Sequence, residues 1–246
     1  MFYPKFQYEA GSDIGLKRKK NEDIWKKSSF SPLFALADGM GGHKAGEIAA
    51  KEAIENLFFS FSNLTDSPNK YSFKQILTNL LISIKSANIH VHNLSKQDLK
   101  FHGMGTTLCC CYFYMRLFIY AHVGDSRIYR FRSNNLLQLT EDHSLINKLL
   151  AKGKLLKKPS SYKNIITKAI GIGPIISPSI SYTDVKKDDI FFMCSDGLSD
   201  YTPYEKIKEI LKNSKNLKNT VNNLIESAKQ NSSFDNITVV MIKIME

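Results

Sequence analysis

The sequence predicts an α+β protein in which two largely antiparallel sheets carry helices on their outer faces. Its expected elements run in the order strands, two helices, strands, two helices and a final strand, so the helices come in pairs. A doubly wound parallel sheet would instead alternate strands and helices one for one. Short apolar runs bounded by glycines and acids indicate buried strands. These observations favour two sheets with helices outside them.

The first part of the chain is organised around Asp38. The apolar run 34–37 predicts a buried strand that ends at this carboxylate, and glycines follow at once, so the backbone can turn sharply. Earlier strands are expected over 6–14 and from Ile24 onward. Burying an acid beside a glycine turn is unfavourable unless the acid is paired or bound to a cation. The rest of the chain should therefore supply a partner for Asp38.

Two helices are expected next. The first begins after Gly46 and ends near Phe61, and a polar loop over 63–70 follows it. Apolar residues then recur at three- and four-residue steps over 73–91, which is typical of a long amphipathic helix with one face on a core.

The second half returns to strands and then to a further helix pair. Strands are expected over 108–114, 117–123, 128–132, 136–139, 190–194 and 237–244, and helices over 203–211 and 217–229. Asp142 is expected to cap a short helix that ends at Leu150. Residues 153–180 are weakly patterned and predict an excursion on the surface.

Composition indicates an ordinary globular protein. The 246 residues are 43% hydrophobic and 23% charged, and they suffice for one large domain or two small ones. No signal peptide is visible at the N-terminus. The apolar stretch 108–123 is interrupted by Arg116 and is better explained by two paired strands than by a membrane helix. We therefore expect a soluble, cytoplasmic protein.

Cysteines and net charge suggest no special chemistry. Cys109, Cys110 and Cys111 are adjacent on an expected strand and point alternately to opposite faces, so they cannot all bind one ion. Small buried side chains in a reducing compartment are the simpler interpretation for these and for Cys194. The net charge of +11 is compatible with nucleic acid, a membrane surface or acidic substrates. No aromatic-interleaved nucleic-acid motif accompanies it, and a lysine-rich solvated surface is simpler.

Four acids share a context that predicts a metal centre. Asp23 stands before an expected strand, Asp38 and Asp196 after strands, and Asp235 before one. Each alone could be a cap or turn residue, but converging carboxylates repel one another unless a cation lies among them. Oxygen ligands select Mg²⁺ or Mn²⁺, and no His/Cys spacing for zinc is present.

Six motifs in order carry a resemblance to a known family. They are Ser12 to Gly15 with Arg18 to Asp23, Ala37 to His43, Gly103 to Thr107, Gly124 to Arg127, Ser195 to Asp200, and Asp235 to Thr238. They resemble the motifs of the metal-dependent serine/threonine protein phosphatases, the PPM or type 2C family, in its bacterial single-domain form. The resemblance covers almost the whole chain. It implies an αββα four-layer sandwich, one domain over residues 1–246, with a two-metal centre at one end.

The resemblance also implies which residues bind the two core Mn²⁺ or Mg²⁺ ions. By the family pattern Asp38 bridges both ions. The carbonyl of Gly39 and the side chain of Glu22 serve the second ion, and Asp196 and Asp235 hold the first.

Further roles follow from the same resemblance. Asp23 would orient metal-bound waters, Arg18 would bind the substrate phosphate, and Asp125 together with Asp196 would hold a third, weaker ion. A planar guanidinium matches two phosphate oxygens, which a lysine cannot do. The implied reaction is hydrolysis of phosphoserine and phosphothreonine in proteins by a metal-bridged water, without a covalent phospho-enzyme.

The sequence departs from the family pattern at the general acid and the flap. Met40 stands where many eukaryotic members carry a histidine, and His43 cannot be assumed to replace it, so the general acid is unassigned. His143 matches a family pattern but is interpreted as structural. The flap is expected over 145–176, and it carries Lys168 where arginine is usual.

The implied partners are phosphorylated proteins and a cognate Ser/Thr kinase, with no nucleic acid, no membrane and a monomeric state. Two alternatives stay open at this point. One is a non-catalytic module of the same fold that binds a phosphoprotein or a kinase, and the other is a nucleic-acid binder, motivated by the basic charge alone. A haloacid-dehalogenase-type phosphatase is disfavoured because the run after Asp38 lacks the Asp-x-Asp pair.

Overall fold

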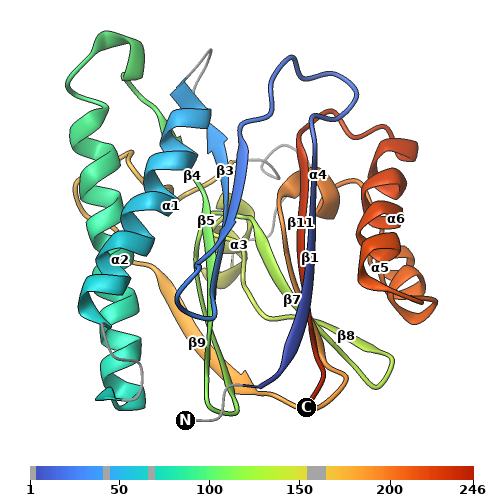
Figure 1. The fold of residues 1–246 in the computed structure, drawn as a ribbon. Helices are drawn as coiled ribbons and strands as arrows, with labels where there is room; N and C mark the ends of the chain where they lie inside the picture. The colour runs from blue at the N-terminus through green and yellow to red at the C-terminus, as the bar shows by residue number, and fades with distance from the viewer. Residues whose placement is uncertain (1–3, 41–44, 66–69, 154–164) are drawn as a thin grey trace.

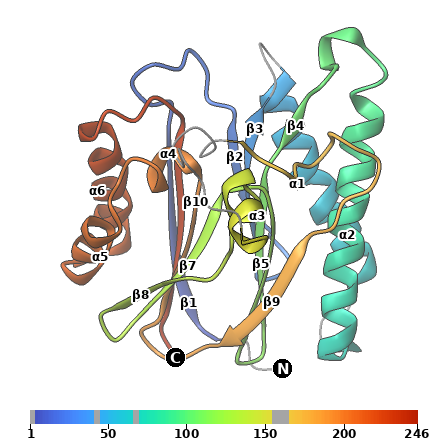
Figure 2. The same cartoon turned by 180° about the vertical axis from the view of Figure 1, so that it is seen from behind.

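The computed structural model describes residues 4–40, 45–65, 70–153 and 165–246. Two antiparallel sheets pack face to face, and helices cover the outer face of each (Figure 1). The view from behind shows the same four layers, with the two helix groups on opposite sides (Figure 2). The predicted α+β sandwich with paired outer helices is therefore confirmed.

The first sheet contains both ends of the chain. Within the described residues its five strands run in the order β1-β11-β10-β7-β8. Their bounds are β1 Phe6–Asp13, β11 Ile237–Ile244, β10 Ile190–Cys194, β7 Arg127–Arg132 and β8 Asn135–Gln138. The central strands β10 and β11 are almost entirely buried, as expected for strands covered on both faces.

The second sheet carries the strand that contains Asp38. Within the described residues its main path runs β2-β3-β5-β6-β9, and the short β4 pairs with β3. The bounds are β2 Asp23–Lys27, β3 Leu33–Met40, β4 Gly105–Thr106, β5 Leu108–Tyr114, β6 Leu117–Val123 and β9 Ser179–Asp184.

The helices form the outer layers. Helices α1 and α2 pack on the second sheet, whereas α4, α5 and α6 pack on the first. Their bounds are α1 Ala45–Leu64, α2 Phe73–Leu94, α4 Asp196–Ser199, α5 Tyr204–Lys212 and α6 Leu217–Gln230. The 3-10 helix η2 (Leu99–Phe101) follows α2, and α3 (Leu145–Ala151) lies in the connection between β8 and β9.

The layer between the sheets is aromatic and aliphatic. Phe118 of β6 stacks on Phe191 of β10 with ring centroids 4.0 Å apart, which joins the two sheets directly. Cys109 and Cys111 point into this layer, whereas Cys110 points into the layer under α1 and α2. The predicted alternation of the adjacent cysteines is thus confirmed, and all four cysteines are buried and free.

Two predicted boundaries were wrong in ways that affect the site. Strand β3 does not end before Asp38 but continues to Met40, because Asp38 pairs with Asp23 of β2 and Gly39 pairs with Thr106 of β4. Asp142 does not cap the short helix. The N-cap of α3 is Ser144, whose side chain accepts a hydrogen bond from the backbone N–H of Asn147.

Strand β9 (Ser179–Asp184) was not predicted, and its first two residues fall within the expected surface excursion 153–180. Its side chains are polar or only partly buried, so no apolar run marks it, and it is recognisable only by its pairing with β6. The elements η2, β4 and α4 are too short to leave a periodic pattern. No helix among the described residues is long and apolar enough to cross a membrane.

Candidate metal centre

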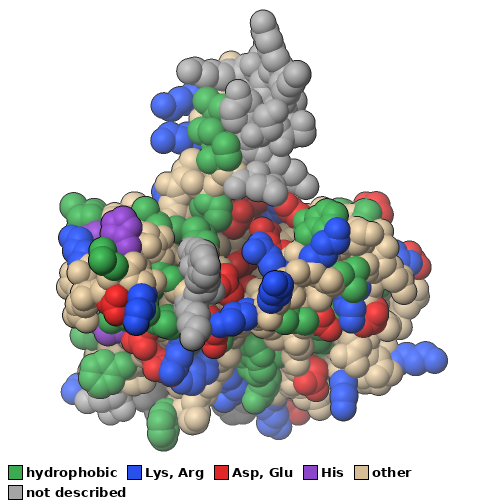
Figure 3. Space-filling model, turned by 90° about the horizontal axis from the view of Figure 1, so that it is seen from above, with side chains coloured by type: hydrophobic (Ala, Val, Ile, Leu, Met, Phe, Trp, Pro, Cys, Tyr) green, Lys and Arg blue, Asp and Glu red, His purple; other side chains and the backbone are tan. Residues whose placement is uncertain are grey.

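Acidic side chains from both sheets meet in one cleft at an end of the sandwich. The cleft has a volume of about 800 Å³. The predicted site residues that line it are Arg18, Glu22, Asp38, Gly39, Asp125, Asp196 and Asp235. Figure 3 looks onto this face and shows acidic side chains gathered in its hollow, with Lys and Arg side chains along one side of them.

Asp38 is held rigidly in β3 by two threonines. Thr107 Oγ1 accepts a hydrogen bond from the backbone N–H of Asp38 at 3.0 Å. The backbone N–H of Thr107 and the hydroxyl of Thr106 both donate to the Asp38 carbonyl, at 2.9 and 2.8 Å. The Gly103 to Thr107 motif therefore fixes the backbone on which the central carboxylate stands.

Gly39 is required by a close approach of helix α1. A Cβ on Gly39 would lie 2.2 Å from the carbonyl oxygen of Gly46 and 2.9 Å from that of Glu22. The backbone N–H of Gly39 donates to the Glu22 carbonyl at 3.2 Å. Without side chains at these two glycines, α1 and the Glu22 segment can pack directly against the strand that carries Asp38.

Asp23 is the one predicted site residue that does not line the cleft. It is only 5% exposed and pairs across β2 and β3 with Asp38. Ser195 donates a hydrogen bond to its Oδ2 at 2.8 Å, while its Oδ1 has no hydrogen-bond partner among the described residues. Asp23 therefore lies next to Asp38 in the sheet but outside the lining of the cleft.

Asp196 and Asp235 enter from the first sheet. Asp196 is the first residue of α4, one residue beyond the end of β10, and its buried Oδ1 has no partner among the described residues. Asp235 immediately precedes Asn236 and β11, and its Oδ2 accepts a hydrogen bond from Arg18 Nη2 at 2.6 Å. Arg18 and Asp235, which are 217 residues apart in the sequence, are thus in direct contact in the cleft.

Burial and crowding of the acids disfavour their charged forms. Burial raises the pKa of Asp38 and of Asp196 well above the ordinary value, and the charges of the surrounding carboxylates raise both further. Burial likewise raises the pKa of Asp23 and of Asp125 to about 6. The pKa of Glu22 is also raised, chiefly by burial. Such a set of acids is tolerated at neutral pH when cations lie among them.

The donor set fits hard divalent ions. Carboxylates, the Gly39 carbonyl and open space for water are the ligands that Mg²⁺ and Mn²⁺ prefer. Among the described residues no three acidic, imidazole or thiol side chains are already gathered around a single point. Mg²⁺ binds through one or two carboxylates while retaining several waters, so a closed cage is not required. The unpartnered Oδ1 of Asp196 is an available ligand atom.

Asn236 anchors the loop that carries Arg18, a role that sequence reasoning did not assign. Its Nδ2 donates to the carbonyls of Ile14 and Lys20, both at 2.9 Å, and its Oδ1 accepts from the backbone N–H of Glu22 at 2.8 Å. The sequence contained the residue within a motif but gave no sign of these contacts. One buried amide thereby holds both ends of the loop beside Asp235.

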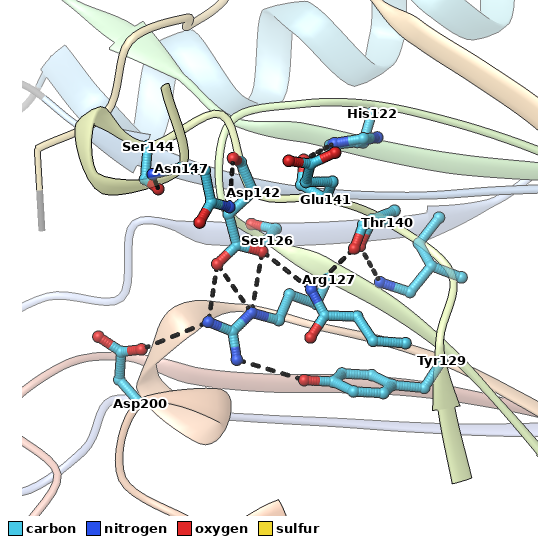
Figure 4. A network of polar contacts seen from close by, with 12 residues as sticks. His122, Ser126, Arg127, Tyr129, Thr140, Glu141, Asp142, Ser144, Asn147 and Asp200 are labelled. Atoms are coloured by element: carbon cyan, nitrogen blue, oxygen red, sulfur yellow. Dashed lines mark hydrogen bonds and ion pairs between the residues drawn. The ribbon is translucent and has the colours of Figure 1, made fainter. Parts of the chain in front are cut away.

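Arg127 is a second residue whose role was not predicted. Its Nε and Nη2 donate to the carboxylate of Asp142, at 3.0 and 2.7 Å, and its Nη1 donates to the hydroxyl of Tyr129 at 3.4 Å (Figure 4). Asp200 lies 3.9 Å from Nη2. These acids border a small pocket that Asp125 also lines. The guanidinium therefore balances negative charge next to Asp125.

His143 has the contacts of a structural residue, in agreement with the sequence interpretation. Its Nδ1 accepts a hydrogen bond from the backbone N–H of Gly124 at 3.2 Å, and its Nε2 lies 2.9 Å from Ser179 Oγ. Its ring stacks on His122 with centroids 4.4 Å apart. Burial lowers the pKa of His143 to about 3, so the ring is neutral and fixes the turn before Asp125.

Two departures from the family pattern, Met40 in place of histidine and Lys168 in place of arginine, can be located next to the cleft. Met40 lines the cleft and carries no acidic proton. Lys168 donates to the carbonyl of Ser177 at 3.1 Å, close to the His143 ring. Residues 41–44, which include His43, and residues 154–164 of the expected flap lie outside the described residues.

Comparisons with known proteins agree with this geometry. The family model described as Protein phosphatase 2C matches residues 18–237. The serine/threonine phosphatase stp of Listeria monocytogenes is 32% identical over 241 residues, which cover 96% of this chain and 94% of that protein. The protein phosphatase PhpP of Streptococcus pneumoniae is 33% identical and covers 96% of each chain.

Solved structures are similar over the same extent. The crystal structure of the Mycobacterium tuberculosis serine/threonine phosphatase PstP/Ppp superimposes with a TM-score of 0.87 at 31% identity, covering 98% of this chain and 99% of that one. A structure of the PstP catalytic domain in complex with two manganese ions has a TM-score of 0.83 at 31% identity, with coverage of 98% and 99%.

Proposed function

The chain belongs to the protein phosphatase 2C family and is a protein-serine/threonine phosphatase, and on this basis we propose that it hydrolyses phosphoserine and phosphothreonine in proteins without forming a covalent phospho-enzyme. The observation that carries the proposal is the meeting of Asp38, Asp196 and Asp235 from two sheets in one cleft beside Arg18. This arrangement combines ligands for cations with a group for the phosphate.

The proposed cofactors are two Mn²⁺ or Mg²⁺ ions, as in the PstP structure with two manganese ions. Bound together, they would supply a bridging water of lowered pKa as the nucleophile and would neutralise charge on the phosphoryl oxygens. Asp38 would serve both ions, Glu22 and the Gly39 carbonyl one of them, and Asp196 and Asp235 the other. Asp125 with Asp196 would hold a third, weaker ion.

Arg18 would bind the substrate phosphate. Its guanidinium stands at the wall of the cleft beside Asp235, and its planar donors match two phosphate oxygens. Asp23 would orient water at the centre from its place next to Asp38 in the sheet. Both roles depend on residues that the structure holds in fixed positions, Arg18 through the anchored loop and Asp23 through Ser195.

We further propose one catalytic domain over residues 1–246 that works as a monomer in the cytoplasm on phosphoproteins made by a cognate Ser/Thr kinase. Four buried, free cysteines support a reducing compartment. A family match over residues 18–237 supports a single catalytic unit.

Hydrolysis of a phosphothreonine peptide tests the proposal. With Mn²⁺ we expect turnover, with excess chelator none, and for Asp38→Asn and Asp196→Asn a loss of roughly 100-fold or more, the size seen when a group that stabilises transition-state charge is removed. Asp188→Asn, at an exposed acid beside Lys243, is the matched control and should retain activity. Calorimetric titration should show weaker Mn²⁺ binding to the two cleft variants.

Two outcomes would contradict the proposal. Activity that survives both the chelator and the two cleft substitutions would exclude a metal-dependent mechanism. Mn²⁺ binding without any turnover would favour a non-catalytic module instead.

A further inference from the structure

The mouth of the cleft has a basic wall that the proposed chemistry does not use. The loop between β1 and β2 contains four consecutive cations, Lys17 to Lys20, all exposed. Arg18 is the proposed ligand of the substrate phosphate, but Lys19 and Lys20 also line the cleft. Neither of these two lysines has a carboxylate within ion-pair distance among the described residues. Both ammonium groups are exposed and can therefore meet a bound molecule, and the charge of Lys20 also acts on Glu22, where it opposes the rise in the pKa of that carboxyl.

The loop is held in a defined position. Asn236 hydrogen-bonds the carbonyls of Ile14 and Lys20, which ties both of its ends to the start of β11. Gly15, with a φ of +76°, lets the backbone pass so close to Asp235 that a Cβ would lie 2.1 Å from the Asp235 carbonyl oxygen. Lys17 is placed over the ring of Phe234, with its Nζ 4.5 Å from the ring centroid. Because the backbone is anchored, the lysines remain at the mouth.

Another part of the cleft wall is apolar. Ile165 and Ile166 line it, and Ile165 is 46% exposed. A peptide whose phosphorylated residue reaches the acidic floor therefore meets lysines and isoleucines at different parts of the wall. A cleft of about 800 Å³ is roughly 9 Å across, equivalent to about three residues of extended peptide.

We propose that Lys19 and Lys20 make this phosphatase select phosphorylated segments that carry acidic residues within about two positions on one side of the phosphorylated residue. This inference rests on the proposed function, because it concerns substrates of the same site. The occupant is an acidic phosphopeptide segment of a protein substrate. Its carboxylates meet exposed ammonium groups, whereas the described part of the apolar wall, Ile165 and Ile166, offers no charged partner to acidic residues on the other side.

Four phosphothreonine peptides of equal length test the proposal in the Mn²⁺-loaded enzyme. One has neutral flanks, one has two glutamates before the phosphothreonine, one has two glutamates after it, and one has two lysines on the preferred side. For one of the two peptides with glutamates, ion pairs to Lys19 and Lys20 should raise kcat/KM over that of the neutral peptide by roughly 3- to 10-fold. The lysine peptide should fall below the neutral one.

The gain should appear mainly in KM, because the flanking contacts are equally present before and during the reaction. It should shrink toward unity as salt is raised to about 0.5 M, since exposed pairs are screened at that ionic strength. This salt series uses the unmodified protein and does not depend on any variant folding.

Two double variants distinguish the effect of Lys19 and Lys20 on the substrate preference from the effect of the protein's net charge. Lys19→Ala/Lys20→Ala should abolish the preference for the glutamate peptide. Lys212→Ala/Lys218→Ala removes the same charge from exposed positions near the junction of α5 and α6, and it should preserve the preference.

The outcomes distinguish this inference from the proposed function. Equal kcat/KM for the neutral and both glutamate peptides, equal gains for both glutamate peptides, or a preference that survives Lys19→Ala/Lys20→Ala would overturn the inference alone. Failure to hydrolyse any of the four peptides with Mn²⁺ would refute the proposed function and this inference with it.

Discussion

Replacing Asn236 by alanine should loosen the loop that carries Arg18 without changing an acid of the cleft. The side chain is 4% exposed and makes three hydrogen bonds, to the carbonyls of Ile14 and Lys20 and from the N–H of Glu22. At about 0.5–1.5 kcal/mol for each bond, the loss of unfolding free energy is roughly 2–4 kcal/mol. Because a typical domain has only about 5–15 kcal/mol, the change is readily measured by urea unfolding.

The loss should extend to substrate binding. Once the loop has lost the anchor at Asn236, Arg18 is no longer held in position at the cleft. We therefore expect KM for a phosphopeptide to rise roughly tenfold. Asn236→Asp keeps the acceptor for Glu22 but places a carboxylate against the other two carbonyls, and it should show a similar rise. Asn231→Ala, which removes one bond at the end of α6, is the control. An Asn236→Ala protein with unchanged unfolding free energy and unchanged KM would falsify this reasoning.

Two further predictions concern packing and pH. Gly39→Ala should destabilise by about 3 kcal/mol or more and weaken Mn²⁺ binding in calorimetry, because the added Cβ meets the Gly46 carbonyl at 2.2 Å; Gly173→Ala, where a Cβ meets nothing within 4 Å, should be near neutral in the same measurements. Burial lowers the pKa of His143 to about 3, so only the unfolded chain takes up this proton as pH falls below about 6.5, and the stability it contributes is lost between there and pH 3. Between pH 7 and pH 5, the free energy of unfolding measured in urea should therefore fall by about 1 kcal/mol less in His143→Gln than in the native protein, allowing for solvent screening. An equal or larger fall in the variant would contradict the assignment of His143 as a neutral, buried residue.

The pattern of apolar residues predicted most of the strands and helices. Strands 108–114, 117–123, 190–194 and 237–244 were predicted with the bounds that the structure shows, because each is a mainly apolar run between turn residues. The helix over 73–91 was placed by its three- and four-residue periodicity. Strand β9 could not be found in this way, since an edge strand with no fully buried side chain is defined by its partner and not by its own sequence.

The site was predictable as a set of residues but not as a set of contacts. Acids at strand ends and the order of the motifs indicated which side chains gather, and seven of the eight line one cleft. The sequence could not show that Asp23 lies next to Asp38 in the sheet, because that depends on the register of β2 against β3. It also could not show the roles of Asn236 and Arg127, whose partners are distant in the chain or part of the backbone.

The layer between the sheets explains why the acids remain together despite their repulsion. Asp38 stands on the second sheet, and Asp196 and Asp235 stand on the first, so separating them would require the sheets to part. Stacked and interlocked side chains such as Phe118 and Phe191 oppose that movement, because a close-packed interior does not deform continuously. The repulsion is therefore relieved locally, by proton uptake or by cations. Divalent ions should bind here because the fold keeps carboxylates from both sheets in one cleft.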